Sequence, residues 1–411
     1  MTRPQKTEHE IHRIIRRESA QLKAALVAHL GPDQLALAED VAQEAILTAL
    51  KNWQQQDVPD KPGAWLKRVA RNRAIDVLRR RARETPIDLA DEPVMPISEP
   101  GFLNPEDAEL RMLYLSCHPA ISPQDQAILC LNLVAGFTAG QISRLLIKPR
   151  QTIAQRLVRL KKKLRQQHDL TELHADAIPH RNASVLRALY LMFCAGYLPP
   201  DGDQLFLADV VGEALRLAEL VAERGDPNAS ALCALFCLQS SRFEAREKEG
   251  MFIPLSQQDR SLWDQALLQR ALYHLKRSQN THTIGRYHIE AAIALEHANA
   301  VDFNSTDWSH IAALYQQLER MTESPIVTVS AALANLYMGE PTRALAQLER
   351  VEKIPSMTRY PAFFAALAEV CMATGDLDKA DAAQKRARQL QANDVLKTYL
   401  DERYASLLQD I

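Results

Sequence analysis

Two stretches rich in arginine and lysine carry the residue types that bind nucleic acid. Lys61–Arg83 contains nine basic residues and one acid, Asp76, while Arg144–Arg165 contains nine basic residues and no acid. Guanidinium groups bind phosphates through paired hydrogen bonds and can also reach base edges. Solvated helix faces usually mix both signs of charge. The two stretches therefore predict two surfaces that bind nucleic acid, and the alternative of solubilising charged faces is less favoured.

Lys61–Arg83 has the periodicity of an amphipathic helix. Apolar residues recur every three or four positions and predict a buried side, which consists of Trp65, Leu66, Val69, Ala70, Val77 and Leu78. Asparagine can both donate to and accept from a base, and arginine donates to phosphate and guanine. We therefore expect DNA to contact the polar side, which consists of Arg68, Arg71, Asn72, Arg79 and Arg80.

The second basic stretch lies within a helix-turn-helix pattern. Ser122-Pro123-Gln124-Asp125 has the residues of a helix start, and Thr138 with Gln141 has those of a capping box for a second helix. Lys148-Pro149 predicts the turn before a third helix, Arg150–Arg165. The turn lacks the usual small residue, so a helical hairpin with a basic solvent face stays open as the alternative.

The third helix of this pattern has an aliphatic inner side and a polar outer side. The inner side consists of Ile153, Leu157, Leu160 and Leu164. Glutamine and arginine side chains suit hydrogen bonding in the major groove. We expect the outer residues to contact DNA, namely Arg150, Gln151, Thr152, Gln155, Arg156 and Arg159.

An acidic helix face precedes both basic stretches. Ala38–Trp53 places small apolar residues on one side of a helix, and the other side carries Asp40, Gln43, Glu44 and Leu47. An exposed leucine at the centre of a polar face does not stabilise a monomer, and a partner helix that covered it would bury its apolar surface. These four residues predict a protein-contact face, with a solvated acidic face as the alternative.

The composition of the whole chain predicts an all-α fold with several domains. The chain has 411 residues, of which 47% are apolar and 24% are charged, enough to form buried cores. Its 13 glycines are about half of the average share, whereas sheet-rich folds need glycine in their turns. The net charge is −2, yet residues 1–170 hold 26 basic and 20 acidic residues, and residues 171–411 hold 23 and 31. We expect the acidic part to contact proteins or to regulate the basic part.

The same composition divides the chain into segments. Residues 7–84 and 106–170 are expected to be helical domains, joined by a proline-rich linker at 85–105. Residues 183–411 are expected to form a larger helical domain. In it Gly339–Ala344 and Gly375–Ala380 share a Gly-x4-Ala spacing, 36 residues apart. This spacing favours tetratricopeptide-like hairpins, with unrelated helix hairpins as the alternative.

The sequence contains no recognisable pattern for catalysis or cofactor binding. It has no phosphate-binding glycine loop, no HExxH and no GxSxG. None of its six cysteines belongs to a CxxC pair, so we expect neither a zinc site nor a disulfide framework. No apolar stretch is long enough to span a bilayer. We therefore expect a soluble cytoplasmic protein that is not an enzyme and needs no metal, cofactor or membrane.

Several of these motifs resemble the sigma-70 family of RNA polymerase sigma factors. Leu37–Ile46, Pro62–Leu66 and Ala70–Arg80 are similar to sigma region 2, and Ser122–Arg165 is similar to sigma region 4. Having these two regions with no third between them resembles the extracytoplasmic-function (ECF) group. Further motifs resemble the ECF group that carries a long helical, tetratricopeptide-like extension, namely Asp259–Asp264, Tyr287–His297 and Thr306–Trp308.

The resemblance implies a role for each polar face. Core RNA polymerase would be bound through its β′ coiled coil and its β flap, with the face from Asp40 to Leu47 on the coiled coil. The helix carrying Arg68 and Asn72 would engage the −10 promoter element, and Arg150–Arg165 would read the −35 element. The C-terminal extension would bind a protein partner or a small ligand.

Two other classes of protein stay open at this point. A one-component helix-turn-helix regulator with a helical sensor domain explains Arg150–Arg165 but leaves Lys61–Arg83 unexplained. An adaptor built from helical repeats explains the C-terminal part and predicts no salt-dependent DNA binding, whereas phosphate contacts predict a steep loss of affinity with salt. Transcription with core polymerase alone separates a sigma factor from both.

Overall fold

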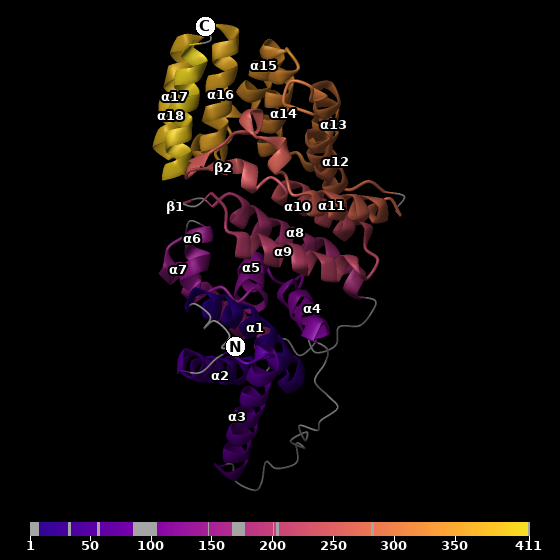
Figure 1. Ribbon diagram of the computed structural model, residues 1–411, viewed down its shortest axis with the longest axis vertical. Coiled ribbons are helices and arrows are strands. Elements are labelled where there is room, and N and C mark those ends of the chain that lie inside the picture. Colours follow the sequence, from indigo (N-terminus) through magenta and orange to yellow (C-terminus); the bar gives the residue numbers. More distant parts are fainter. Residues whose placement is uncertain are drawn as a thin grey trace, which may run out of the picture. The chain divides into compact units, whose positions relative to one another are not determined.

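The computed structural model describes residues 8–31, 34–55, 58–84, 105–146, 148–166, 177–199, 201–202, 205–280 and 283–409. Helices dominate these residues (Figure 1), which confirms the expected all-α fold. The strands in the described ranges are two residues long: β1 (Asp201–Gly202) pairs parallel with β4 (Ala392–Asn393), and β2 (Glu247–Lys248) pairs antiparallel with β3 (Met251–Phe252). Except for Pro105, the expected linker lies outside the described residues.

The chain divides into two compact units, one of Met1–Arg144 with Lys148–Leu191 and one of Leu145–Ile147 with Met192–Ile411. The first unit is built from α1 (Glu8–Leu30), α2 (Leu35–Gln55), α3 (Pro62–Glu84), α4 (Pro105–Ser116), α5 (Pro123–Leu129), the π-helical turn η3 (Cys130–Val134), α6 (Ala139–Leu145), α7 (Arg150–Gln166) and the start of α8 (Ala177–Tyr197).

Small side chains let the first three helices pack closely. Ala38, Ala42, Ala45 and Ala49 on α2 are all fully buried, and α2 packs against both α1 and α3. The end of α2 meets the start of α3 through Trp53 and Trp65, whose ring centroids lie 5.5 Å apart. Because this alanine side is buried, the opposite side of α2 is turned to solvent.

The expected helix starts of the helix-turn-helix pattern are confirmed. The Ser122 hydroxyl accepts a hydrogen bond from the Asp125 backbone N–H at 3.3 Å and donates to the Asp125 carboxylate at 2.8 Å. Thr138 and Gln141 cap α6 reciprocally, through Thr138 N–H to Gln141 Oε1 (2.9 Å) and Gln141 N–H to Thr138 Oγ1 (3.3 Å). After Pro149, α7 begins at Arg150 and packs against α5.

The second unit is a succession of helices. They are α9 (Ala208–Ala222), α10 (Pro227–Ser240), α11 (Gln265–Ser278), α12 (Arg286–Asn299), α13 (Trp308–Thr322), α14 (Pro325–Tyr337), α15 (Pro341–Glu352), α16 (Pro361–Thr374), α17 (Leu377–Leu390) and α18 (Asp394–Gln409), with the short turns η5 (Glu244–Arg246), η6 (Leu255–Gln257), η7 (Arg260–Leu262) and η8 (Met357–Arg359). From α12 to α18 each helix packs against the next (Figure 1).

The two Gly-x4-Ala segments form the same turn. Gly339 and Gly375 have φ of +90° and +83°. The backbone N–H of the residue after each glycine donates to the carbonyl of the residue five positions before that donor, at 2.9 Å in both turns. This left-handed C-cap ends α14 and α16 and turns the chain into α15 and α17. Ala344 and Ala380 are then fully buried. The repeated spacing therefore marks two equivalent helix hairpins.

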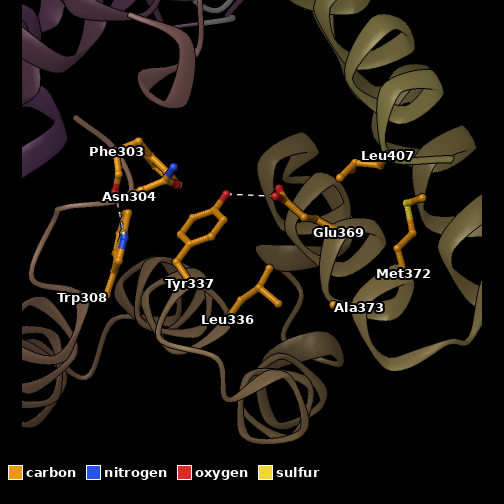
Figure 2. A pocket seen from close by; sticks show the side chains of 9 residues that line it. All are labelled: Phe303, Asn304, Trp308, Leu336, Tyr337, Glu369, Met372, Ala373 and Leu407. Carbon is orange, nitrogen blue, oxygen red and sulfur yellow. Dashed lines mark hydrogen bonds between the residues drawn. The ribbon is translucent and has the colours of Figure 1, made fainter. Parts of the chain in front are cut away.

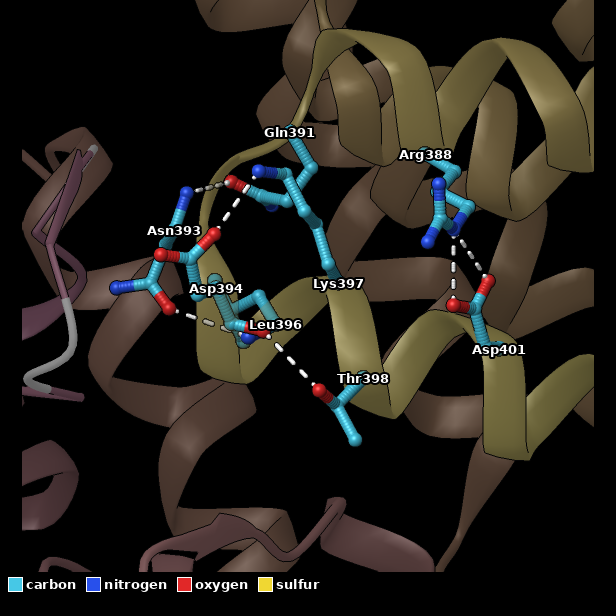
Figure 3. A network of polar contacts seen from close by, with 8 residues as sticks. All are labelled: Arg388, Gln391, Asn393, Asp394, Leu396, Lys397, Thr398 and Asp401. Carbon is cyan, nitrogen blue, oxygen red and sulfur yellow. Dashed lines mark hydrogen bonds and ion pairs between the residues drawn. The ribbon is translucent and has the colours of Figure 1, made fainter.

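Polar contacts close the last turn of this succession (Figure 3). The Asn393 side chain accepts from the Leu396 N–H at 3.1 Å and so caps the start of α18. Arg388 on α17 is paired with Asp401 on α18 at 2.8 Å. The Arg388–Asp401 pair joins α17 to α18.

His297 on α12 makes the second unit sensitive to acid. Burial and the nearby Arg242 and Arg260 lower the pKa of His297 to about 4. The unfolded chain binds this proton near pH 6.5, so the stability gained from the neutral ring is complete above that pH and is lost as the pH falls towards 4. We expect the free energy of unfolding to fall by about 3 kcal/mol between pH 6.5 and pH 4, which denaturant unfolding at each pH measures. The His297→Gln variant should lack this part of the pH profile, and an unchanged profile would contradict the assignment.

No helix among the described residues combines the length and the apolar character that crossing a membrane requires.

Candidate polymerase and nucleic-acid interfaces

The acidic face of α2 is exposed over its whole length. Asp40, Gln43, Glu44 and Leu47 are all exposed, and Leu47 keeps 49% of its surface accessible. These residues recur at three- and four-residue spacing and so share one side of the helix. Covering an exposed apolar side chain with a partner helix is favourable by roughly 25 cal/mol per Å² of apolar surface.

Glu44 on this face is paired with an arginine of the neighbouring helix. The Arg73 guanidinium on α3 holds the Glu44 carboxylate with two hydrogen bonds, one of them 3.1 Å long. The hydrogen bond from Arg73 lowers the pKa of Glu44, and the same contact raises the pKa of Arg73. The acidic face and the basic helix are therefore electrostatically connected.

The basic face of α3 lies where the periodicity predicts. Arg68, Asn72, Arg79 and Arg80 are exposed, and Arg71 is half-buried. The opposite side is less deeply buried than expected. Leu66 and Ala70 are fully buried, whereas the other predicted residues are half-buried, namely Trp65, Val69, Val77 and Leu78. Four polar side chains on α3 are thus open to a long polyanion such as a nucleic-acid strand.

The two sides of α7 also match the prediction. Ile153, Leu157, Leu160 and Leu164 are buried. The exposed residues are Arg150, Gln151, Gln155 and Arg159, while Thr152 and Arg156 are half-buried. This side presents amides and guanidinium groups near the start of a helix, which is the part of a recognition helix that contacts base edges.

Arg156 on α7 has a partner on α5. Its Nη1 lies 3.6 Å from Oδ1 of Asp125 on α5. The other Asp125 oxygen accepts from Ser122, so this carboxylate joins the cap of α5 to α7. Arg156 therefore has a structural contact that Arg159 does not share, and the two arginines can be distinguished by experiment.

A second carboxylate of α2 reaches α7. The Lys161 ammonium group donates to Glu39, and both side chains are largely buried, with 19% and 25% of their surfaces exposed. Lys23 of α1 lies near the same carboxylate, and burial lowers the pKa of Lys23 even though Glu39 raises it. Lys163 on α7 is exposed and donates to the Ala120 carbonyl. Two lysines of the C-terminal half of α7 thus tie this helix to the rest of the first unit.

Comparison with known proteins places these faces in a family. Residues 14–84 match sigma-70 region 2, and an uncharacterized protein of Rhizobium meliloti (strain 1021) is 36% identical over 327 residues, which cover 77% of each chain. The chain belongs to the sigma-70 family. Residues 181–279 match a family of unknown function (DUF6596). No solved structure matches the chain.

Sigma-70 region 2 here contains all of α2 and α3 and most of α1. Both the acidic face with Leu47 and the basic face with Arg68 therefore belong to the domain by which sigma factors bind core polymerase and promoter DNA. Sequence reasoning did not single out Arg73, Glu39, Lys161 or Asp125 as pairing residues. No local signal could have found them, because their partners lie 29 to 122 positions away in the chain.

The C-terminal part of this sigma-family protein contains a hollow of about 490 Å³ (Figure 2). Phe303, Asn304 and Trp308 lie on one side of it and Met372 and Leu407 on the other, with Tyr337 and Glu369 between. Tyr337 donates to Glu369 at 3.0 Å, and Arg403 pairs with the same oxygen at 2.7 Å.

The chemistry of this hollow suits an apolar group rather than a cation. The rings of Phe303, Trp308 and Tyr337 lie 4.8–5.0 Å apart, centroid to centroid, so they contact one another and leave no room for a cation between them. Arg403 already balances the charge of Glu369. Burial, followed by the Glu369 charge, raises the pKa of Tyr337 well above its ordinary value, so the phenol stays neutral.

The described residues contain no group of three or more potential ligands arranged to hold a metal ion.

Proposed function

We propose that the protein is an ECF-type sigma factor that directs core RNA polymerase to specific promoters and starts transcription there. The observation that carries this proposal is the match of residues 14–84 to sigma-70 region 2, in which an exposed acidic face with Leu47 and an exposed arginine face lie on neighbouring helices. Sigma factors catalyse no bond formation, so the protein would supply specificity and DNA opening to the polymerase.

In this proposal the acidic face of α2 binds the β′ coiled coil. Asp40, Gln43 and Glu44 would surround Leu47 with charge and hydrogen-bonding groups while the partner helix covers the leucine. The basic face of α3, with Arg68, Arg71, Asn72, Arg79 and Arg80, would hold the opened −10 element. Unstacking a base there costs a few kcal/mol, which phosphate contacts and stacking offset.

The helix-turn-helix of residues 106–170 would act as sigma region 4. Its exposed side on α7, with Arg150, Gln151, Thr152, Gln155, Arg156 and Arg159, would read the −35 element in the major groove, and the domain would contact the β flap. Support comes from the confirmed caps of α5 and α6 and from an α7 whose inner side is wholly aliphatic.

The extension from residue 183 onwards would regulate the cytoplasmic sigma factor by binding a protein partner or a small ligand. Its acidic balance disfavours contact with DNA. The hollow lined by Trp308, Tyr337 and Met372 is the place where an apolar group of such a partner would fit.

The proposal is tested by mixing the full chain with purified core polymerase and promoter DNA from its host. We expect a stable holoenzyme on a sizing column, and promoter affinity that falls steeply between 50 and 200 mM salt, as phosphate contacts require. A protein that binds operator DNA without joining the polymerase would instead be a helix-turn-helix regulator, and the proposal would be wrong.

A further inference from the structure

We propose that three arginines of the second unit, Arg242, Arg246 and Arg260, form a binding site for the phosphate group of a small molecule. Because it names a ligand class for the C-terminal extension, the site rests on the proposed function for its regulatory meaning, whereas phosphate binding itself can be measured without polymerase.

The three arginines lie close to one another against aromatic rings. The guanidinium carbons of Arg242 and Arg260 lie 5.5 and 5.2 Å from the ring centroid of Trp263. Arg246 is 3% exposed, and its guanidinium carbon lies 4.0 Å from the ring centroid of Tyr197. Burial and the nearby charge of Arg242 lower the pKa of both Arg246 and Arg260. Arg242 is therefore close enough to repel the other two guanidinium groups.

Two of these arginines bind backbone carbonyls at helix ends. Arg260 donates to the carbonyls of His297 and Ala300 at the end of α12. Arg246 donates through Nη1 to the Tyr197 carbonyl, the last residue of α8, at 3.1 Å. The end of a helix carries only a partial negative charge, equivalent to about half an elementary charge. These contacts hold the side chains in place and leave part of their positive charge unbalanced.

Arg242 has only neutral partners, and donors remain free around it. Its Nε and Nη1 donate to the side-chain oxygens of Gln258 and Gln239, at 3.1 and 3.4 Å. Among the described residues, the Nη2 of Arg242 and the Nε and Nη2 of Arg246 have no acceptor. The indole N–H of Trp263 is also buried without an acceptor. The cluster therefore has more hydrogen-bond donors than the protein satisfies.

Carboxylates are plentiful in this part of the chain, yet none pairs with the cluster. Residues 171–411 hold 31 acidic and 23 basic residues. Asp302 raises the pKa of Arg260, but its carboxylate accepts from the Ser305 backbone N–H at 2.7 Å and forms no ion pair with the arginine. Other arginines of the second unit do pair with carboxylates, namely Arg216, Arg270, Arg286, Arg350, Arg388 and Arg403. An anion from solution would offset the repulsion that the protein leaves in place.

A phosphate group suits the donors that remain. Guanidinium groups bind phosphate oxygens through paired hydrogen bonds. A phosphate ester carries about two negative charges near pH 7, so it balances more of this cluster than a single carboxylate can. Arg242 and Arg260 are half-buried rather than sealed, so a small ligand can reach them.

Calorimetry on the full chain, without polymerase or DNA, tests the site. Inorganic phosphate replaces chloride at constant ionic strength, and adenosine 5′-monophosphate is titrated in parallel to compare free phosphate with a phosphate ester. We expect saturable binding of at least one of them with a Kd below about 1 mM. The tighter ligand identifies the source of the phosphate group. Folded wild-type protein that shows no saturable binding of either would overturn the site.

Arg242→Gln should lower this affinity by roughly tenfold or more. Arg350→Gln is the matched control, because Arg350 is exposed on α15 and pairs with Glu319 on α13, and it should bind phosphate as the wild-type chain does. Both variants keep the basic faces of α3 and α7, so phosphate attracted to those faces cannot account for a difference between them. Equal affinity in the two variants would give the three arginines a purely structural role.

A labelling experiment on the wild-type chain decides the question if Arg242→Gln does not fold. Phenylglyoxal modifies accessible guanidinium groups, and mass spectrometry identifies the modified positions. Phosphate should slow the modification of Arg242 and leave that of Arg350 unchanged, and equal rates at Arg242 with and without phosphate would overturn the site. Because polymerase is absent throughout, a chain that binds no phosphate but starts transcripts would refute this site alone.

Discussion

The Leu47→Asp variant is expected to lose binding to core RNA polymerase, with an affinity at least 100-fold lower than that of the wild-type chain, or about 3 kcal/mol. Leu47 is the exposed apolar centre of the α2 face, and a carboxylate at that position would have to be buried without a partner when the coiled coil docks. Because the side chain touches no core in the free protein, circular dichroism should show unchanged helix content.

The neighbouring Thr48 provides the matched control. It is exposed on the same helix, and its hydroxyl donates only to the Glu44 carbonyl. Thr48→Asp adds the same charge one position away and should retain most of the affinity. Holoenzyme formation by Leu47→Asp at the wild-type level, or an equal loss in Thr48→Asp, would contradict the role given to Leu47.

Arg159→Ala is expected to weaken binding to the −35 element by about 1–3 kcal/mol, or roughly 5- to 150-fold, and to relax its sequence preference. Arg159 is exposed on the outer side of α7, so its guanidinium group is available to a base edge. Holoenzyme binding to cognate and scrambled −35 DNA, measured at fixed salt concentration, gives both quantities.

Arg156→Ala is the informative comparison on the same helix. Its guanidinium already faces Asp125 at 3.6 Å, so removing it should weaken the packing of α7 against α5 and cost less discrimination between cognate and scrambled DNA. If Arg159→Ala loses affinity equally for both DNAs, Arg159 contacts phosphate only. If Arg156→Ala shows the larger loss of discrimination, Arg156 is the base-reading residue.

Much of the secondary structure and many of the exposed faces follow from local sequence. Helix periodicity places Leu47 opposite the alanines of α2, and Arg159 opposite Leu157 and Leu164 on α7, without knowledge of the fold. Capping depends on residues three positions apart, so Thr138 and Gln141 suffice to locate the start of α6.

What the sequence could not predict depends on pairs far apart in the chain. From the sequence alone, Glu44 is expected to be a free carboxylate on the polymerase-binding face, whereas the structure pairs it with Arg73. Arg156 is likewise expected to contact a base, whereas the structure places it against Asp125. The partial exposure of Val77 and Leu78 was missed because periodicity tells which side a residue is on but not how far the neighbouring helices extend.

The most direct test of the central claim is run-off transcription with purified core polymerase, this protein and a library of upstream sequences from its host. We predict discrete transcripts that require both the protein and the core enzyme and that disappear with Leu47→Asp. If no upstream sequence yields a transcript that depends on the protein, its assignment as an initiating sigma factor is contradicted.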